Sequence, residues 1–217
     1  RLVSAEDTRH AGGGAVFPLK ELKRIRSLCT KHSLPVHIDG SRIFNASVAS
    51  GVAPASYGKA AGSLMFCLSK GLGAPVGSIL AGSRDFIAEA RRVSLRLGGG
   101  MRQAGIVAAG GLYALRHHIG RLAEDHENAR ALARGLAEIP GVEIVNAPVP
   151  TNIVLFCWQT PTLSPPSFRE SLAAGGVLVD DSAFPLFRAV THLGIGKREI
   201  ARALRAFGKI LGGGKRA

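Results

Sequence analysis

Two short apolar segments, each ending abruptly in polar residues, constrain the fold of this chain more than any other feature. Residues 34–38 run into Asp39-Gly40, and residues 63–68 run into Ser69-Lys70-Gly71. Apolar segments of this length are typical of buried strands, whereas the apolar residues of 18–33 recur at helical spacing. Short apolar strands that alternate with helices predict an α/β fold with a mostly parallel sheet, covered on both faces.

The rest of the chain predicts a second, smaller unit. A third strand is expected at 76–81, and a helical pattern follows over 84–139, interrupted by three glycines at 98–100. Beyond it the pattern predicts an α+β arrangement, with strands at 142–146, 152–158, 176–180 and 188–192 and helices near 167–174 and 197–211. We therefore expect a large domain over 1–125 that carries the sheet, and a small domain over 126–217, joined within a long helix.

The composition is typical of a globular protein with a buried core. The chain has 217 residues, 46% of them hydrophobic, which is enough to bury a core and excludes a disordered segment. Cys29, Cys67 and Cys157 show no paired spacing and lie in apolar segments, which indicates buried free thiols in a reducing compartment. No apolar run approaches the roughly 18 residues of a membrane span. We expect a cytoplasmic protein, with a mitochondrial location as the alternative, and neither a membrane partner nor a metal site.

The net charge of +13 raises the expectation of an anionic partner such as nucleic acid, a membrane surface or a phosphorylated ligand. The alternative is a basic surface with no such role. The last predicted helix carries five cations opposite its apolar residues: Lys197, Arg198, Arg202, Arg205 and Lys209. No aromatic stacking platform or recognition motif accompanies them, so a solvated basic face is favoured and no nucleic-acid partner is expected.

The polar residues that end the two strands suggest chemistry. Ligands of open α/β sheets bind beyond the carboxyl ends of the strands. A lysine directly after a strand, here Lys70, can bond covalently to a carbonyl compound, although a surface lysine is the plainer reading. Asp39, which alone would more often be an N-cap or a metal ligand, supplies the carboxylate that keeps a pyridine nitrogen protonated. Together the two residues point to pyridoxal phosphate.

Four longer segments resemble motifs of one known family. Residues 37–46 are similar to its H-x-D-G-A-R-x-x-N-A motif, and residues 67–78 are similar to its lysine motif. Residues 98–105 and 124–129 also match, in the same order. These are motifs of the low-specificity L-threonine aldolases, pyridoxal-phosphate enzymes of the aspartate-aminotransferase fold. The resemblance runs over nearly all 217 residues.

The resemblance implies roles for five residues. Lys70 matches the lysine that bonds to the cofactor, and Asp39 matches the partner of the pyridine nitrogen. Arg42 matches an arginine near the substrate carboxylate, and Arg188 matches the arginine that binds this carboxylate from the small domain. Arg102 matches an arginine that, in this family, reaches the cofactor phosphate of a neighbouring subunit. A homodimer or homotetramer that acts on a small amino acid is implied.

The chain also departs from the family. Where the family has E-N-T-H, this chain has Glu6-Asp7-Thr8-Arg9, so a fixed cation replaces a histidine that approaches the substrate hydroxyl. His10 is adjacent, but neighbouring side chains of an extended segment point apart. The family's phosphate loop and its histidine that stacks on the cofactor have no match here. We therefore expect an N-terminally incomplete large domain with exposed strand edges and weak cofactor retention.

The function implied by the resemblance is retro-aldol cleavage of L-threonine or L-allo-threonine to glycine and acetaldehyde. This activity belongs to threonine catabolism and glycine formation. Two alternatives stay open at the level of the sequence. One is a truncated or catalytically inactive relative of the aldolases, and the other is a basic binding protein that uses the same fold as a scaffold.

Overall fold

The computed structural model describes residues 1–158, 164–183 and 186–212. The chain divides into two compact units. The first unit comprises Arg1–Thr8 and Val16–Leu122, and the second comprises Arg9–Ala15 and Ala123–Ala217. Each unit has its own sheet, and each is described by itself below.

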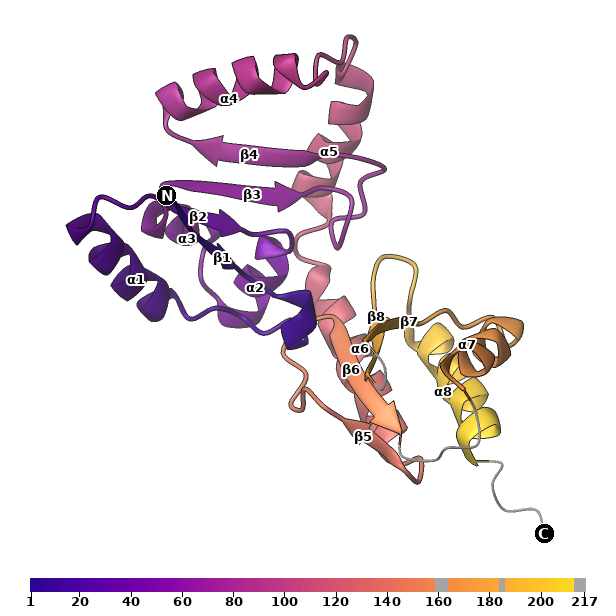
Figure 1. The fold of residues 1–217 in the computed structure, drawn as a ribbon. Helices are drawn as coiled ribbons and strands as arrows, with labels where there is room; N and C mark the ends of the chain where they lie inside the picture. Colours follow the sequence, from indigo (N-terminus) through magenta and orange to yellow (C-terminus); the bar gives the residue numbers. More distant parts are fainter. Residues whose placement is uncertain (159–163, 184–185, 213–217) are drawn as a thin grey trace. The chain divides into compact units, whose positions relative to one another are not determined.

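The sheet of the first unit has four strands in the order β1-β2-β3-β4. They are β1 (Val3–Glu6), β2 (Val36–Asp39), β3 (Ser63–Cys67) and β4 (Ser78–Gly82). β1, β2 and β3 are parallel, and β4 runs antiparallel to β3 (Figure 1). The mostly parallel sheet is therefore confirmed. The sequence did not predict β1, because its four residues alternate apolar and polar over too short a stretch.

Three helices cover one face of this sheet. They are α1 (Leu19–Lys31), α2 (Ile43–Ser50) and α3 (Pro54–Ala60). Their apolar side chains pack with Val36, Ile38 and Leu64, which are all buried. The helix predicted over 18–33 is confirmed as α1. α2 and α3 were not predicted from the sequence, although Gly51, with a φ of 72°, ends α2 in the left-handed conformation that glycine adopts readily.

The sequence predicted that helices cover both faces of the sheet, but β4 is not covered in this way. All five residues of β4 are exposed. None of the residues of α4 (Arg84–Arg96) is buried, and the structure describes every one of them. Large apolar side chains continue along the turn into α5 (Gly105–His117), with Leu97 82% exposed and Ile106 83% exposed. Isolated soluble domains rarely leave so much apolar surface in contact with water.

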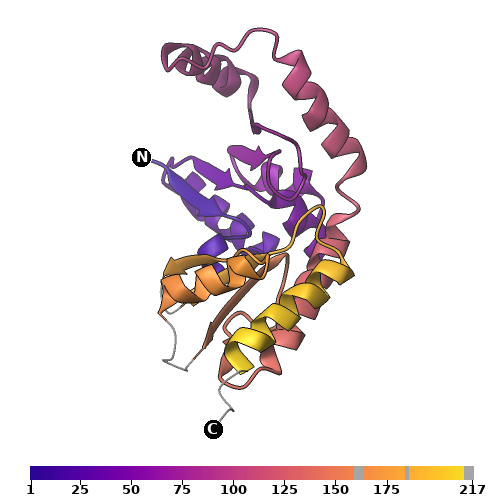
Figure 2. The same ribbon diagram turned by 90° about the vertical axis from the view of Figure 1, so that its right-hand side faces the viewer.

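The second unit contains an antiparallel sheet in the order β5-β6-β8-β7. Its elements are α6 (Leu122–Ala137), β5 (Val142–Ile144), β6 (Ile153–Trp158), α7 (Pro165–Ala174), β7 (Asp180–Ala183), β8 (Leu186–Val190) and α8 (Lys197–Leu211). Figure 2 shows α7 and α8 side by side. Four fully buried phenylalanines form the centre of the core: Phe156, Phe168, Phe187 and Phe207. Each such side chain contributes about 2–3 kcal/mol by its removal from water.

The α+β character predicted for this part of the chain is confirmed, but the positions of two strands were wrong. The strand predicted at 176–180 begins at Asp180 instead. The reason is that the amide of Val177 donates to the carbonyl of Leu172 and so closes the turn after α7. The strand predicted at 188–192 is β8, which ends at Val190, and the carbonyl of the next residue, Thr191, accepts from the Asn152 side-chain amide at 2.8 Å.

Three further properties of the described residues concern their cysteines, their potential metal ligands and the apolar character of their helices. The three cysteines are free, and of these Cys29 is buried whereas Cys67 and Cys157 are half-buried. Within the described ranges, no group of three or more histidine, cysteine, aspartate or glutamate side chains is placed to hold a metal ion. No helix of these ranges combines the length and the apolar character needed to cross a bilayer.

Candidate cofactor and substrate site

Asp39 is the last residue of β2 and lies at the carboxyl edge of the parallel sheet. Its Oδ1 accepts hydrogen bonds from the Ser41 amide at 3.0 Å and from the Ser41 hydroxyl at 2.7 Å. The turn is tight, because a Cβ at Gly40 would lie 2.9 Å from the carbonyl oxygen of Met65. The half-buried carboxylate is therefore held in one orientation, with its other oxygen left for a further partner.

Lys70 follows β3, the strand next to β2, and lies in a loop that glycines shape. The Leu68 amide donates to the Gly77 carbonyl at 2.9 Å, and the Gly73 amide donates to the Lys70 carbonyl at 2.9 Å. A Cβ at Gly71 would lie 2.8 Å from the Asn45 side-chain oxygen. The backbone of Lys70 is thus fixed, while its amine is exposed and makes no hydrogen bond or ion pair with the described residues.

Arg42 lies in the same turn as Asp39 and precedes the first residue of α2. Its carbonyl accepts from the amides of Asn45 and Ala46, so the helix begins directly behind the Asp39 turn. Three of the five residues that the sequence proposed therefore lie at or shortly after the ends of two adjacent parallel strands.

Arg102 lies elsewhere in the first unit, in the turn between α4 and α5, and is exposed. Its neighbour Gln103 has a φ of 54°, a left-handed conformation that is uncommon outside glycine. The exposed apolar side chains of Leu97, Met101 and Ile106 come from the same segment. The structure places Arg102 in an apolar surface region and not in the turns that follow β2 and β3.

Arg188 lies in the second unit, in the middle of β8. Its Nη2 donates to Oδ2 of Asp180, which is directly opposite on β7. The side chain of Arg188 is 20% exposed, and its Nε is buried with no hydrogen-bond acceptor among the described residues. Asp180 was not predicted from the sequence, because its pairing with Arg188 depends on a strand register that the residue pattern did not fix.

The segment around Arg9 is not extended, so the argument from alternation was wrong for it. Thr8 has a φ of 53°, and His10–Gly12 forms a 3-10 turn that brings Arg9 into a bridge with Ala15. The carbonyls of Gly13 and Gly14 accept from side chains of the second unit, Asn146 and Thr151, each at 2.8 Å. These bonds make residues 9–15 part of the second unit.

The buried titratable groups outside the five proposed residues include Asp7 and His126. Burial raises the pKa of Asp7 despite hydrogen bonds from the amides of Phe17 and Thr8. In the second unit, burial lowers the pKa of His126 to about 4, and the nearby Arg130 adds to this effect. The imidazole of His126 is therefore neutral at physiological pH, and its burial in α6 indicates a packing role.

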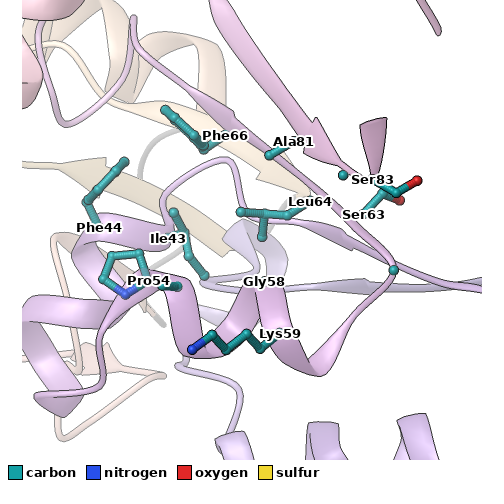
Figure 3. Close-up of a pocket in the computed structure, with 13 residues that line it drawn as sticks. Ile43, Phe44, Pro54, Gly58, Lys59, Ser63, Leu64, Phe66, Ala81 and Ser83 are labelled. Carbon is teal, nitrogen blue, oxygen red and sulfur yellow. The ribbon is translucent and has the colours of Figure 1, made fainter. Parts of the chain in front are cut away.

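The first unit also contains an apolar pocket of about 520 Å³ between α2, α3 and the β3-β4 pair. Figure 3 shows Ile43, Phe44, Leu64 and Phe66 around this pocket, with Lys59 along its lower edge. Because Lys70 and Asp39 are not among its lining residues, this pocket is separate from the polar strand ends.

The two units have the fold of known threonine aldolases. A threonine aldolase from Leishmania major has the same fold, with a TM-score of 0.74 at 16% identity, over 97% of this chain and 61% of that one. The Beta-eliminating lyase family model matches residues 1–159. The chain belongs to this family.

Two curated relatives are similar over almost the whole chain. Low-specificity L-threonine aldolase 1 of Arabidopsis thaliana is 37% identical over 208 residues, 95% of this chain and 58% of the relative. The low specificity L-threonine aldolase of Escherichia coli K12 is 39% identical over 201 residues, 93% of this chain and 57% of the relative. The chain thus spans less than three fifths of the length of these relatives. The family resemblance seen in the sequence motifs is confirmed.

Proposed function

We propose that this protein binds pyridoxal phosphate and cleaves L-threonine or L-allo-threonine to glycine and acetaldehyde. The observation that carries the proposal is the position of Asp39 at the end of one strand and of Lys70 shortly after the end of the adjacent parallel strand. Similarity to two enzymes named as low-specificity L-threonine aldolases supports the choice of substrate.

The donor set at these strand ends fits the cofactor. The exposed amine of Lys70 is able to bond to its aldehyde carbon, and the oriented carboxylate of Asp39 is able to hold a proton on its ring nitrogen. The chemistry that pyridoxal phosphate supplies when bound is an electron sink for the bond that breaks. The role of Asp39 would be to keep that sink protonated, and two hydrogen bonds from Ser41 hold its carboxylate in one orientation.

We propose Arg188 and Arg42 as the residues that bind the substrate carboxylate. A guanidinium group meets a carboxylate with two parallel hydrogen bonds, which fixes the orientation of the amino acid as well as its position. The buried Nε of Arg188 is a donor for which the described residues provide no acceptor. Fixing the carboxylate would set which bond at the α carbon is broken.

The Arg188→Ala variant should chiefly raise the KM for threonine. The loss of a charge-assisted pair costs roughly 1.5–3 kcal/mol, which corresponds to about a tenfold to hundredfold increase. A smaller decrease in kcat is expected from poorer orientation. Steady-state kinetics with Arg169→Ala, an exposed arginine of the same unit, as the control would test this. Unchanged constants for Arg188→Ala would mean that the carboxylate is bound elsewhere.

The activity itself is tested by incubating the purified protein with pyridoxal phosphate and L-threonine and measuring glycine and acetaldehyde. Formation of both products in equal amounts supports the proposal. Cofactor binding without products would indicate an inactive relative. Absence of cofactor binding would favour the basic binding protein that the net charge of +13 left open.

We also propose that a second copy of the chain covers the apolar surface around Arg102. This surface includes Leu97, Met101 and Ile106, each more than 65% exposed. Burial of such side chains is the main driving force of association. Arg102 would then lie at a subunit interface, and a homodimer or a homotetramer would follow.

The double variant Leu97→Glu/Ile106→Glu should therefore shift the protein from oligomer to monomer. Two carboxylates placed in an apolar interface are costly to desolvate, and neither side chain contributes to the core of its own unit. Light scattering coupled to size exclusion measures the mass directly. Leu178→Glu, a change at a residue 86% exposed in the second unit, is the control. A wild-type protein that is already monomeric would refute the interface.

A further inference from the structure

Asp180 and Arg188 form an ion pair whose geometry is set by the sheet. The two residues are directly opposite each other in the β7-β8 register. The carboxylate oxygen Oδ2 of Asp180 accepts from Nη2 of Arg188. The arginine side chain is only 20% exposed, whereas the aspartate side chain is 53% exposed. The carboxylate thus approaches a largely buried guanidinium from the solvent side.

This ion pair leaves part of the guanidinium unused. Asp180 engages Nη2, while the adjacent Nε is buried and has no acceptor among the described residues. An arginine that binds a carboxylate in full uses two donors in parallel. Arg188 therefore already holds one carboxylate through one donor, while its buried Nε has no acceptor among the described residues.

We propose that Asp180 is a built-in competitor for Arg188, and that its negative charge sets the affinity of the site for the substrate carboxylate. The inference rests on the proposed role of Arg188 as the residue that binds this group. An arriving carboxylate has to displace Asp180 or share the guanidinium with it, and in both cases two like charges meet at one cation. Like charges at close range disfavour each other, so the charge of Asp180 weakens substrate binding.

Two substitutions separate the effect of the negative charge of Asp180 from the effect of its shape. Asn at position 180 keeps the size and a carbonyl oxygen that accepts from Nη2, but it removes the negative charge. The Asp180→Asn variant should therefore lower the KM for threonine by about threefold to tenfold with kcat nearly unchanged. The Asp180→Ala variant also lacks the charge and should lower the KM, although by less, because Arg188 then loses a fixed partner.

The experiment compares wild type, Asp180→Asn, Asp180→Ala and the control Glu170→Gln, which removes one exposed carboxylate of α7 from the same unit. Circular dichroism first establishes that each variant is folded. Steady-state kinetics with threonine and calorimetric titration with glycine, a carboxylate ligand that needs no turnover, are the two readouts. Lower KM and tighter glycine binding for both Asp180 variants, without a change for Glu170→Gln, support the proposal.

Other results would contradict the proposal that Asp180 competes with the substrate for Arg188. An unchanged or higher KM for Asp180→Asn would show that Asp180 only positions Arg188, and an equal gain for Glu170→Gln would show an effect of net charge alone. If wild type does not cleave threonine, the proposed function fails, but glycine binding still decides the role of Asp180. Absence of glycine binding in wild type and in both Asp180 variants would refute the inference.

Discussion

Replacing Lys70 with alanine is expected to lower the rate of threonine cleavage by roughly a thousandfold or more, since the amine is the proposed covalent attachment of the cofactor. The side chain is exposed and makes no hydrogen bond or ion pair with the described residues, so the loss of its amine should leave the fold intact. The Lys70→Ala protein should therefore have a wild-type melting temperature and a strongly reduced kcat.

Chemical trapping gives a readout that is independent of turnover. Borohydride reduction of the wild-type protein with pyridoxal phosphate should label Lys70, and mass spectrometry of the digest locates the label. The matched control is Lys59→Ala, which removes another exposed lysine of the first unit, at the rim of the apolar pocket (Figure 3). Trapping at Lys59 or at any other lysine would show that Lys70 has been assigned wrongly.

The elements predicted best from the sequence are those whose local pattern and tertiary environment agree. α1 has a buried stripe at Leu22 and Cys29, and β3 is a short apolar run with a polar end, so periodicity alone identified both. α2 and α3 are only eight and seven residues long, which is too short for a helical period to become apparent. β1 is stabilised by its pairing with β2 and by the packing of Val3 and Ala5 on the core, and neither of these can be read from four residues.

The residues of the candidate site also divide into those that the sequence pattern suggested and those that depend on tertiary structure. Asp39 and Lys70 could be proposed from the sequence because a polar residue at the end of an apolar segment is unusual, and the parallel register of β2 and β3 brings the ends of these strands to one edge of the sheet. Ser41 and Asp180 were not predictable. The contact of Ser41 depends on a tight turn around Gly40, and that of Asp180 depends on which residues of β7 and β8 lie opposite each other. Short-range patterns point to the residues proposed to carry chemistry, but the partners of these residues follow from register and turn geometry.

Removing the carboxylate of Asp39 should have the second largest effect, and this effect should fall on kcat. The carboxylate is proposed to hold a proton on the cofactor ring nitrogen, so its loss weakens the electron sink during bond cleavage without removing a contact to the substrate. We expect Asp39→Ala to lower kcat by roughly a hundredfold to a thousandfold, with a much smaller change in KM. Steady-state kinetics at saturating cofactor measures both constants.

Ser41→Ala and Glu21→Ala complete this test. Ser41→Ala keeps the charge of Asp39 but removes the 2.7 Å hydrogen bond that orients it, so kcat should fall by a smaller factor, about threefold to tenfold. Glu21→Ala removes a carboxylate of α1 that pairs with Arg24 on the surface, and it should leave kcat unchanged. If Asp39→Ala and Ser41→Ala lower kcat equally, orientation would account for the whole effect. A change confined to KM would place Asp39 at the substrate and not at the cofactor ring.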